Sequence, residues 1–246
     1  MNGPRNPDGS THRAPGPTGA GSVRVQLIGP LAVLVDGEAA DIPAGRATQL
    51  LALLALHQGR FVSADVIVEA LWADPQPSAY QGVASLVSRL RRAIGRHTIE
   101  GDRHGYRLAA EAETDLGEIE DLVGVAGDHL RAGHPARAAT PATRALALLE
   151  RGHLLEAYPD APWADDARRV LERQHRQAWE VGWSAGSQIG DHALAAELAE
   201  AALAADELDE AATVAAMTAW SALGRVGRAD AAGQGPGRTV GAGPRR

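Results

Sequence analysis

The sequence predicts an α+β winged helix-turn-helix unit at residues 23–109, followed by an all-α helical unit of tetratricopeptide (TPR) type at residues 114–224. Three observations indicate this fold class. Short apolar runs with a two-residue period precede three helical segments, as expected for a small β-sheet and three helices. Two runs of β-formers around closely spaced glycines then predict a C-terminal β-hairpin wing. The second half is Ala-rich and has helical periodicity throughout.

Composition excludes several classes of protein. The 246 residues include no Cys, which rules out disulfides, thiolate metal sites and cysteine nucleophiles, and which fits a cytoplasmic location. The longest apolar run, residues 50–56, is far shorter than the ~20 residues of a membrane span, so no membrane partner is expected. HExxH and P-loop patterns do not occur in the sequence. We therefore expect no enzyme activity, no metal and no cofactor.

The two ends differ from the rest in composition. Residues 1–22 are rich in Gly, Pro and small polar side chains, so we expect a disordered leader. Residues 225–246 combine Gly and Pro at a density that no helix sustains, so we expect an irregular Gly/Pro/Arg tail. The tail does not continue the helical repeat pattern of the preceding segment, which is what an altered C-terminus would produce.

The first elements are a sheet and two helices. Alternating apolar residues from Val23 and an Asp36-Gly37 turn predict a small antiparallel sheet. The Leu-rich segment 45–57 is apolar nearly all round, so it should form a helix at the centre of the unit. Ser63 is a good N-cap for a second helix. Its buried face is expected to consist of Val66, Ile67, Ala70, Leu71 and Trp72.

The third helix, residues 78–95, carries the functional signal. Val83, Leu86, Val87, Leu90 and Ile94 share one face at 3.6 residues per turn and should pack on the core. The opposite face carries amide, hydroxyl and guanidinium groups, which suit phosphates and base edges in a major groove. A solvated surface is the alternative interpretation of such a face. The hairpin predicted at residues 99–108 favours DNA, because a helix leading into a basic hairpin is the layout of a winged helix.

The charge distribution supports this interpretation. The formal net charge is −7, yet residues 85–107 contain six Arg against Glu100 and Asp102. Residues 109–224 instead contain eight Arg against 21 Asp or Glu. A basic patch on an acidic protein can bind DNA, because distant charges are screened beyond roughly 8 Å at physiological salt.

Seven residues are candidate DNA contacts. Arg89 and Arg92 lie on the outer face of the third helix and are expected to contact phosphates or bases. Arg91 lies nearer the buried stripe, so it either contacts phosphate or covers the core with its stem. Arg103, at the hairpin tip, is expected to contact the minor groove or the backbone, the alternative being a hydrated turn residue. Secondary contacts, or simply hydrated side chains, are expected at Gln81, Ser85 and Ser88.

The second half is expected to form five helices, near residues 116–132, 135–151, 163–188, 192–205 and 208–223. The segment after Gly190 has the pattern of a TPR-type helix-turn-helix repeat. Four of the five Trp lie in this half, and large aromatics at helical spacing are expected to fill seams between helices, with a ligand pocket as the alternative. His129 and His134 are not spaced as a metal-ligand pair.

The motifs resemble a known family. RATQLLALLALHQGRFVSADVIVEALWADPQP (46–77), VASLVSRLRRAIG (83–95) and HGYRL (104–108) are similar to the OmpR-type winged helix of the Streptomyces antibiotic regulatory proteins and their larger AfsR-type relatives. ERGHLLEAYPDAPWADDARRVLERQHRQAWEV (150–181) resembles the bacterial transcriptional activator domain that follows it in that family. The resemblance covers residues 23 to about 228. The nucleotide-binding module of the larger relatives is missing from this sequence.

The resemblance implies a sequence-specific transcriptional regulator, an activator of secondary-metabolite genes that binds direct repeats in double-stranded DNA. It implies that the helical half contacts RNA polymerase or forms a homodimer. The alternative hypothesis is a TPR-like protein-interaction scaffold with a vestigial winged helix.

Overall fold

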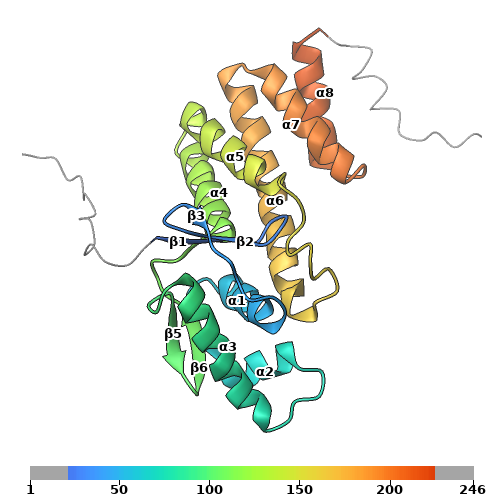
Figure 1. Ribbon diagram of the computed structural model, residues 1–246. Helices are drawn as coiled ribbons and strands as arrows, with labels where there is room; N and C mark the ends of the chain where they lie inside the picture. Colours follow the sequence, from blue (N-terminus) through green and yellow to red (C-terminus); the bar gives the residue numbers. More distant parts are fainter. Residues whose placement is uncertain (1–21, 225–246) are drawn as a thin grey trace, which may run out of the picture.

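The computed structural model describes residues 22–224, and it consists of a winged half and a helical half, one above the other (Figure 1). The leader predicted at residues 1–22 lies outside these residues except for Ser22, and the tail predicted at 225–246 lies outside them entirely. Among the described helices, none is both long and apolar enough to cross a bilayer. The elements of the winged half are β1 (Val23–Gln26), β2 (Ala32–Val35), β3 (Glu38–Ala39), α1 (Arg46–Leu56), β4 (Val62–Ser63), α2 (Ala64–Leu71), α3 (Ser78–Ile94), β5 (Ile99–Asp102) and β6 (Gly105–Leu108).

Two small sheets flank the three helices of the winged half. The first has the order β3-β2-β1-β7, in which β1 and β2 are antiparallel and β7 (Glu113–Thr114) runs parallel to β1. The predicted antiparallel sheet is therefore present, with the Asp36-Gly37 turn between β2 and β3. The second sheet has the order β4-β6-β5 and contains the predicted wing. The sequence did not predict β4 and β7, because a two-residue strand has no period to detect.

Helix α1 lies at the centre of the winged half, as predicted. Four of its leucines are each at most 1% exposed: Leu50, Leu51, Leu53 and Leu54. Helix α2 begins at the predicted cap, where the Ser63 hydroxyl accepts a hydrogen bond from the Val66 amide at 3.3 Å.

The prediction for the buried face of α2 was wrong at one position. Val66 is 45% exposed, and Val68 is buried in its place. Both faces of this short helix carry valine, so its periodicity alone does not select the buried one. Ile67 and Leu71 are buried as expected, while Ala70 and Trp72 are half-buried.

The helical half consists of antiparallel helices in TPR-like pairs. Its elements after β7 are α4 (Asp115–Arg131), α5 (Pro135–Leu149), the 3-10 helix η1 (Pro162–Ala164), α6 (Asp165–Ile189), α7 (His192–Ala205) and α8 (Glu210–Ala222). These bounds agree closely with the predicted ones, except that the segment from Trp163 starts as η1. Gly190 ends α6 in a left-handed conformation (φ 80°), and the Asp191 carboxylate caps α7 by accepting from the Leu194 amide. Helix α6 is the longest, and its N-terminal end lies beside the winged half (Figure 1).

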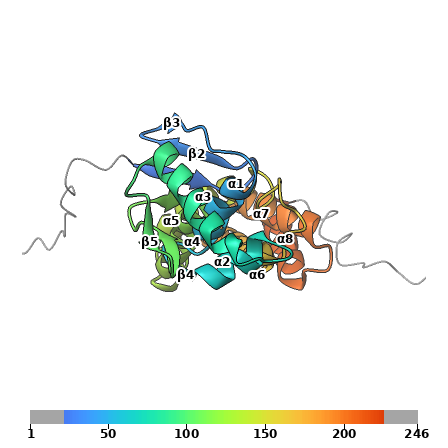
Figure 2. The same cartoon turned by 60° about the horizontal axis from the view of Figure 1, so that its bottom comes forward.

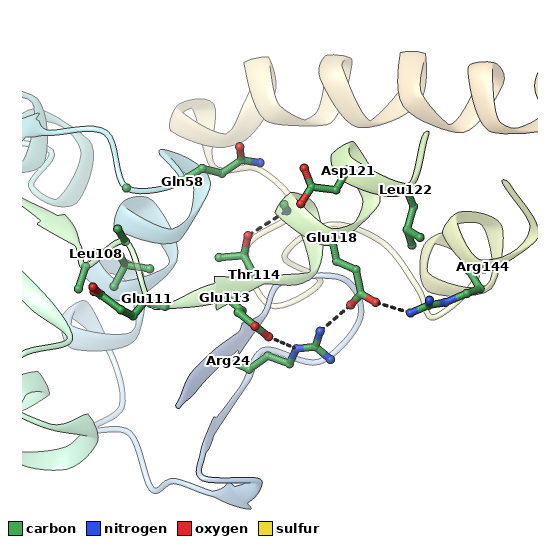
Figure 3. A pocket seen from close by; sticks show the side chains of 15 residues that line it. Arg24, Gln58, Leu108, Glu111, Glu113, Thr114, Glu118, Asp121, Leu122 and Arg144 are labelled. Atoms are coloured by element: carbon green, nitrogen blue, oxygen red, sulfur yellow. Dashed lines mark hydrogen bonds and ion pairs between the residues drawn. The ribbon is translucent and has the colours of Figure 1, made fainter. Parts of the chain in front are cut away.

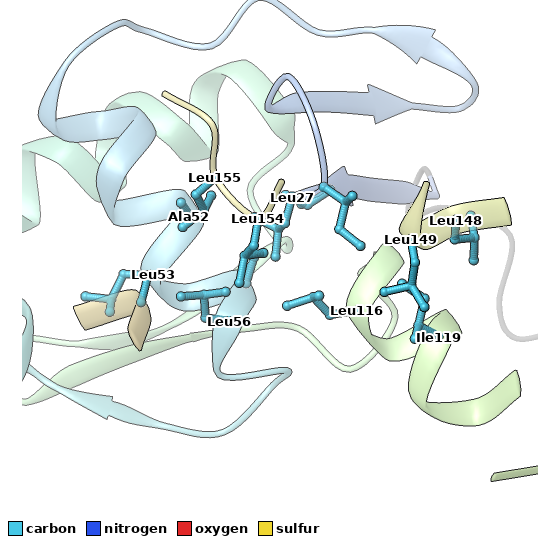
Figure 4. Packing of buried hydrophobic residues seen from close by; sticks show 14 of the residues in the cluster. Leu27, Ala52, Leu53, Leu56, Leu116, Ile119, Leu148, Leu149, Leu154 and Leu155 are labelled. Carbon is cyan, nitrogen blue, oxygen red and sulfur yellow. The ribbon is translucent and has the colours of Figure 1, made fainter. Parts of the chain in front are cut away.

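The two halves share one hydrophobic core. Leu27, Leu53 and Leu56 of the winged half meet Leu116 and Ile119 of α4, together with Leu148, Leu149, Leu154 and Leu155 around the α5–α6 loop (Figure 4). The apolar end of β1 and the apolar loop after α5, more than 120 residues apart in the chain, cover each other.

Hydrogen bonds and ion pairs reinforce this junction. One carboxylate oxygen of buried Asp115, at the start of α4, accepts from the Leu27 and Ile28 amides at 2.8 Å each. Figure 3 shows Arg24 of β1 between Glu113 and Glu118, at 3.6 and 2.6 Å, and Arg144 of α5 at 3.1 Å from Glu118. The junction therefore joins β1, α4 and α5 by polar contacts around the shared apolar core.

Candidate nucleic-acid interface

Helix α3 lies across the end of the molecule farthest from α7 and α8 (Figures 1 and 2). Its buried residues face α1, α2 and β5, and they are the predicted stripe of Val83, Leu86, Val87, Leu90 and Ile94 together with Ala79. The helix begins after Pro77 and ends at Gly95, whose φ of 103° suits glycine. The opposite face of α3 points away from the helical half (Figure 2).

Five of the seven predicted contact residues share that exposed face of α3. Arg89 and Arg92 are exposed, and within residues 22–224 neither guanidinium pairs with a carboxylate. Their donors therefore remain available to phosphate or base acceptors. The exposed polar side chains on the same face are Gln81, Ser85 and Ser88.

Arg91 has a different environment from its two neighbours. It is half-buried, and its guanidinium donates to the Ile99 carbonyl at 2.9 Å and to the Gly101 carbonyl at 3.2 Å. It also lies 5.9 Å from the centre of the Tyr106 ring. Arg91 therefore attaches the wing to α3 through its guanidinium, a role that the sequence did not predict, and fewer of its donors remain for DNA.

The wing is a tight hairpin with Arg103 at its tip. Arg103 is exposed, and the Asp102 carboxylate next to it accepts from the His104 amide at 2.9 Å, which holds the turn. Further along, Arg107 and Glu100 face each other across the two strands and form an ion pair at 2.7 Å. Because that pair cancels its own charge, Arg103 is the main cationic group of the wing. Tyr106 and Leu108 are buried.

The structure adds Arg46 to this surface, a residue that the sequence did not single out. Its guanidinium donates to the Leu71 carbonyl at 3.2 Å and lies 4.9 Å from the centre of the Trp72 ring. Together with Trp72 it lines a shallow cleft that also contains Ser85 and Arg89. Arg46 starts α1, more than 30 residues before α3, so no local pattern could have linked it to the candidate interface.

Tyr80, at the start of α3, is exposed, and its hydroxyl donates to Asp65 at 2.8 Å. That hydrogen bond to a carboxylate raises the pKa of Tyr80 above its usual value of 10.0. Within residues 22–224, no cluster of three or more His, Asp or Glu is arranged to hold a metal ion. The surface offers donors to an anionic ligand rather than ligands to a cation.

Comparison with known proteins places both halves in described families. Residues 43–108 match the family described as "Transcriptional regulatory protein, C terminal", and residues 114–233 match the "Bacterial transcriptional activator domain". The chain is 29% identical over 181 residues to the regulatory protein AfsR of Streptomyces griseus. That alignment covers 73% of this chain and 18% of AfsR, so the chain spans about a fifth of that relative's length. It is 30% identical over 152 residues to the transcriptional regulator RedD of Streptomyces coelicolor, covering 61% of this chain and 43% of RedD.

A solved structure has the same fold. The structure of Mycobacterium tuberculosis EmbR in complex with a low-affinity phosphopeptide superposes with a TM-score of 0.76 at 23% identity. The superposition covers 86% of this chain and 58% of EmbR, so both the winged half and the helical half are shared. The matches to the two domain families and to the two relatives indicate the same kind of protein. The chain belongs to the Streptomyces antibiotic regulatory protein family, which joins an OmpR-type winged helix to a bacterial transcriptional activator domain.

Proposed function

We propose that the chain is a sequence-specific DNA-binding transcriptional regulator that inserts α3 into the major groove of duplex DNA. The observation that carries this proposal is the pair of exposed, carboxylate-free guanidiniums of Arg89 and Arg92, on a helix face that the helical half does not cover. In this arrangement the wing follows α3 directly, so Arg103 is positioned for the neighbouring backbone or minor groove. Arg46 adds a further cation beside Arg89.

The helical half supplies the regulatory output in this proposal. It carries most of the acidic residues of the chain and lies behind the winged half in the view onto α3 (Figure 2). The proposed protein activates secondary-metabolite genes through contact of this half with RNA polymerase, or with a second copy that occupies an adjacent direct repeat. Support comes from the family membership and from the names of the relatives, which are regulatory proteins.

The test uses the intact chain, because removal of the helical half would expose the core that it shares with the winged half. Duplexes are selected from a random library by the wild-type protein and then assayed by gel shift. We expect one enriched motif, and we expect Arg89→Ala and Arg92→Ala each to weaken its binding. A base contact would cost about 1 to 3 kcal/mol.

The matched control is Arg173→Ala, which removes an exposed Arg from α6, away from α3. It should leave the affinity unchanged. Failure to enrich any motif, with the protein folded, would contradict the proposal and favour the alternative of a protein-interaction scaffold.

A further inference from the structure

A second surface feature lies in the helical half, on the side of the α5–α6 loop. Here the loop and the first turns of α6 enclose a cavity of about 740 Å³, within the range of about 300–1,000 Å³ that small-molecule sites occupy. Its walls include Leu149, Leu154, Pro159 and Leu171, two of them buried in the shared core. The cavity thus offers apolar surface to the body of a ligand.

The polar lining of this cavity is predominantly acidic. Glu150, Glu156 and Glu172 line it and are exposed residues, and the Glu156 carboxylate accepts a hydrogen bond from the His153 amide at 3.2 Å. The lining cation, Arg168, is already engaged: it donates to the Tyr158 carbonyl at 2.7 Å, to the Ala161 carbonyl at 3.2 Å and to Asp165 at 2.8 Å. The net field therefore favours a cationic ligand.

His175 adds a polar group that does not repel a cation. It lines the cavity and stacks on Trp179, with the two ring centres 3.8 Å apart. Its Nε2 atom is buried and has no hydrogen-bond partner among the described residues. Burial lowers the pKa of His175 below its usual 6.5, so the imidazole is neutral at physiological pH.

The back of the cavity is the junction between the two halves. The His153 carbonyl accepts from the Gly29 amide at 2.9 Å, and the Leu155 amide donates to the Leu27 carbonyl at 2.8 Å. Leu154, whose side chain lines the cavity, forms an isolated bridge with Ile28. One short segment therefore contacts both the cavity and the end of β1.

We propose that this cavity binds a small organic cation with an apolar body, such as a primary amine, and that binding stabilises the contact between the α5–α6 loop and β1. The carboxylates would pair with the ammonium group while the leucines cover its hydrocarbon part. Any effect on DNA rests on the proposed function; binding to the cavity and the response of the junction do not, and both are measured without DNA.

Binding is measured by Trp fluorescence of the intact chain during titration through the millimolar range. Phenethylamine, cyclohexylmethylamine and putrescine serve as probes, with phenylpropionate as the acidic counterpart and phenylethanol as the neutral one. We expect a saturable change with at least one of the two apolar amines, lost in Trp179→Phe, and no comparable change with the acid or the alcohol. No saturable change with any amine, or equal binding of all compounds, would overturn the proposal.

Carboxylate variants locate the site. Each partly exposed ion pair contributes at most a few-fold in affinity, so the double variant Glu150→Gln, Glu172→Gln should weaken amine binding roughly five- to tenfold. Glu180→Gln removes the same charge from an exposed position of α6 outside the cavity and should leave binding unchanged. Equal affinity of the double variant and the control would place the amine elsewhere and contradict the proposal.

Hydrogen exchange tests the coupling to the junction. Saturating amine should slow exchange of the Gly29 and Leu155 amides several-fold in the wild type, since both donate across the contact that the ligand stabilises. The exposed first amide of α8, at Glu210, serves as an internal reference. Amine binding without any change at Gly29 and Leu155 would refute the coupling.

Discussion

Adjacent arginines on α3 differ in what their guanidiniums contact. Arg92 is exposed and has no carboxylate partner among the described residues, whereas Arg91 holds two carbonyls of the wing and lies over Tyr106. Both belong to one Arg-Arg dipeptide, and a rotation of 100° per residue separates their environments. The sequence correctly predicts Arg91 at the edge of the buried stripe. It does not predict the contacts with the Ile99 and Gly101 carbonyls, because these residues lie outside the helix and helical periodicity does not describe them.

This difference gives a prediction for stability. Arg91→Ala should lower the free energy of unfolding by about 1 to 2 kcal/mol, because two hydrogen bonds from a charged donor are lost at a half-buried site. Arg92→Ala should change it by less than about 0.5 kcal/mol, as exposed substitutions usually do. Urea unfolding of both variants checks this. Equal destabilisation of the two would contradict the separate roles assigned to them.

Asp115 is the residue on which the polar part of the junction depends. Burial raises its pKa above the usual 3.8, although hydrogen bonds from the Ile28, Leu27 and Leu116 amides act in the opposite direction. Asp115→Ala would leave the Leu27 and Ile28 amides unpaired, so we expect a loss of about 3 kcal/mol in stability. Asp115→Asn keeps one acceptor and should lose less. Denaturant titration of the two variants measures the difference.

The raised pKa also predicts a pH dependence. Because the folded state holds this proton more tightly than the unfolded state, stability from Asp115 is present below pH 3.8 and is lost as pH rises through its raised folded pKa. The stability of the wild type relative to Asp115→Asn should therefore fall as pH rises from 3.8 and then level off. A relative stability that instead increases over this range would show that the amide hydrogen bonds outweigh burial.

At the scale of single elements, the sequence predicted most of the fold. The helices follow from apolar periodicity and from caps such as Ser63 and Asp191, which act locally. The wing follows from its β-formers and glycines. The parts that were not predicted, β4 and β7, are two-residue strands whose partners lie more than 40 residues away, where no local pattern reports the pairing. Likewise, Arg46 joins the candidate site only through tertiary contact with Trp72.

The wing depends on close approach of its backbone to β4. A Cβ at Gly105 would overlap the Val62 carbonyl and the Phe61 ring. Gly105→Ala should therefore destabilise the β4-β6-β5 sheet by about 2 kcal/mol and speed amide exchange in β6. The control is Gly124→Ala in α4, where a Cβ meets nothing within 4 Å and should add about 0.5 to 1 kcal/mol of stability. If Gly105→Ala changed neither the stability of this sheet nor amide exchange in β6, the wing would tolerate a wider strand spacing and the prediction would be wrong.

At the scale of the whole molecule, the two halves share one hydrophobic core, so we expect them to unfold as one cooperative unit. Leu27 and Ile28 at the end of β1 and Leu154 and Leu155 after α5 are all buried by residues of the other half. Sequence composition divided the chain correctly into a winged and a helical half, but it could not show that their apolar ends meet. The position of the winged half relative to the helical half is therefore fixed by side-chain packing rather than by a linker.

Cooperative unfolding is the corresponding prediction. Ile119 is fully buried at the junction, so Ile119→Ala should lower the free energy of unfolding by about 2 to 5 kcal/mol. Calorimetry should show one transition in the wild type, and one transition at lower temperature in Ile119→Ala. Val125→Ala, at a 48% exposed position of the same helix, is the control. Two separate transitions, only one of them shifted by Ile119→Ala, would contradict a shared core.

The most direct test of the DNA interface is the salt dependence of binding by the intact chain to its selected duplex. The logarithm of the affinity is plotted against the logarithm of salt concentration for the wild type, Arg89→Ala, Arg92→Ala and the α6 control Arg173→Ala. Each α3 variant should either bind about 1 to 3 kcal/mol more weakly or show a slope smaller by about one, according to whether its Arg contacts a base or a phosphate. Affinities and slopes of both α3 variants that coincide with those of the wild type would contradict the assignment of α3 as the DNA-reading helix.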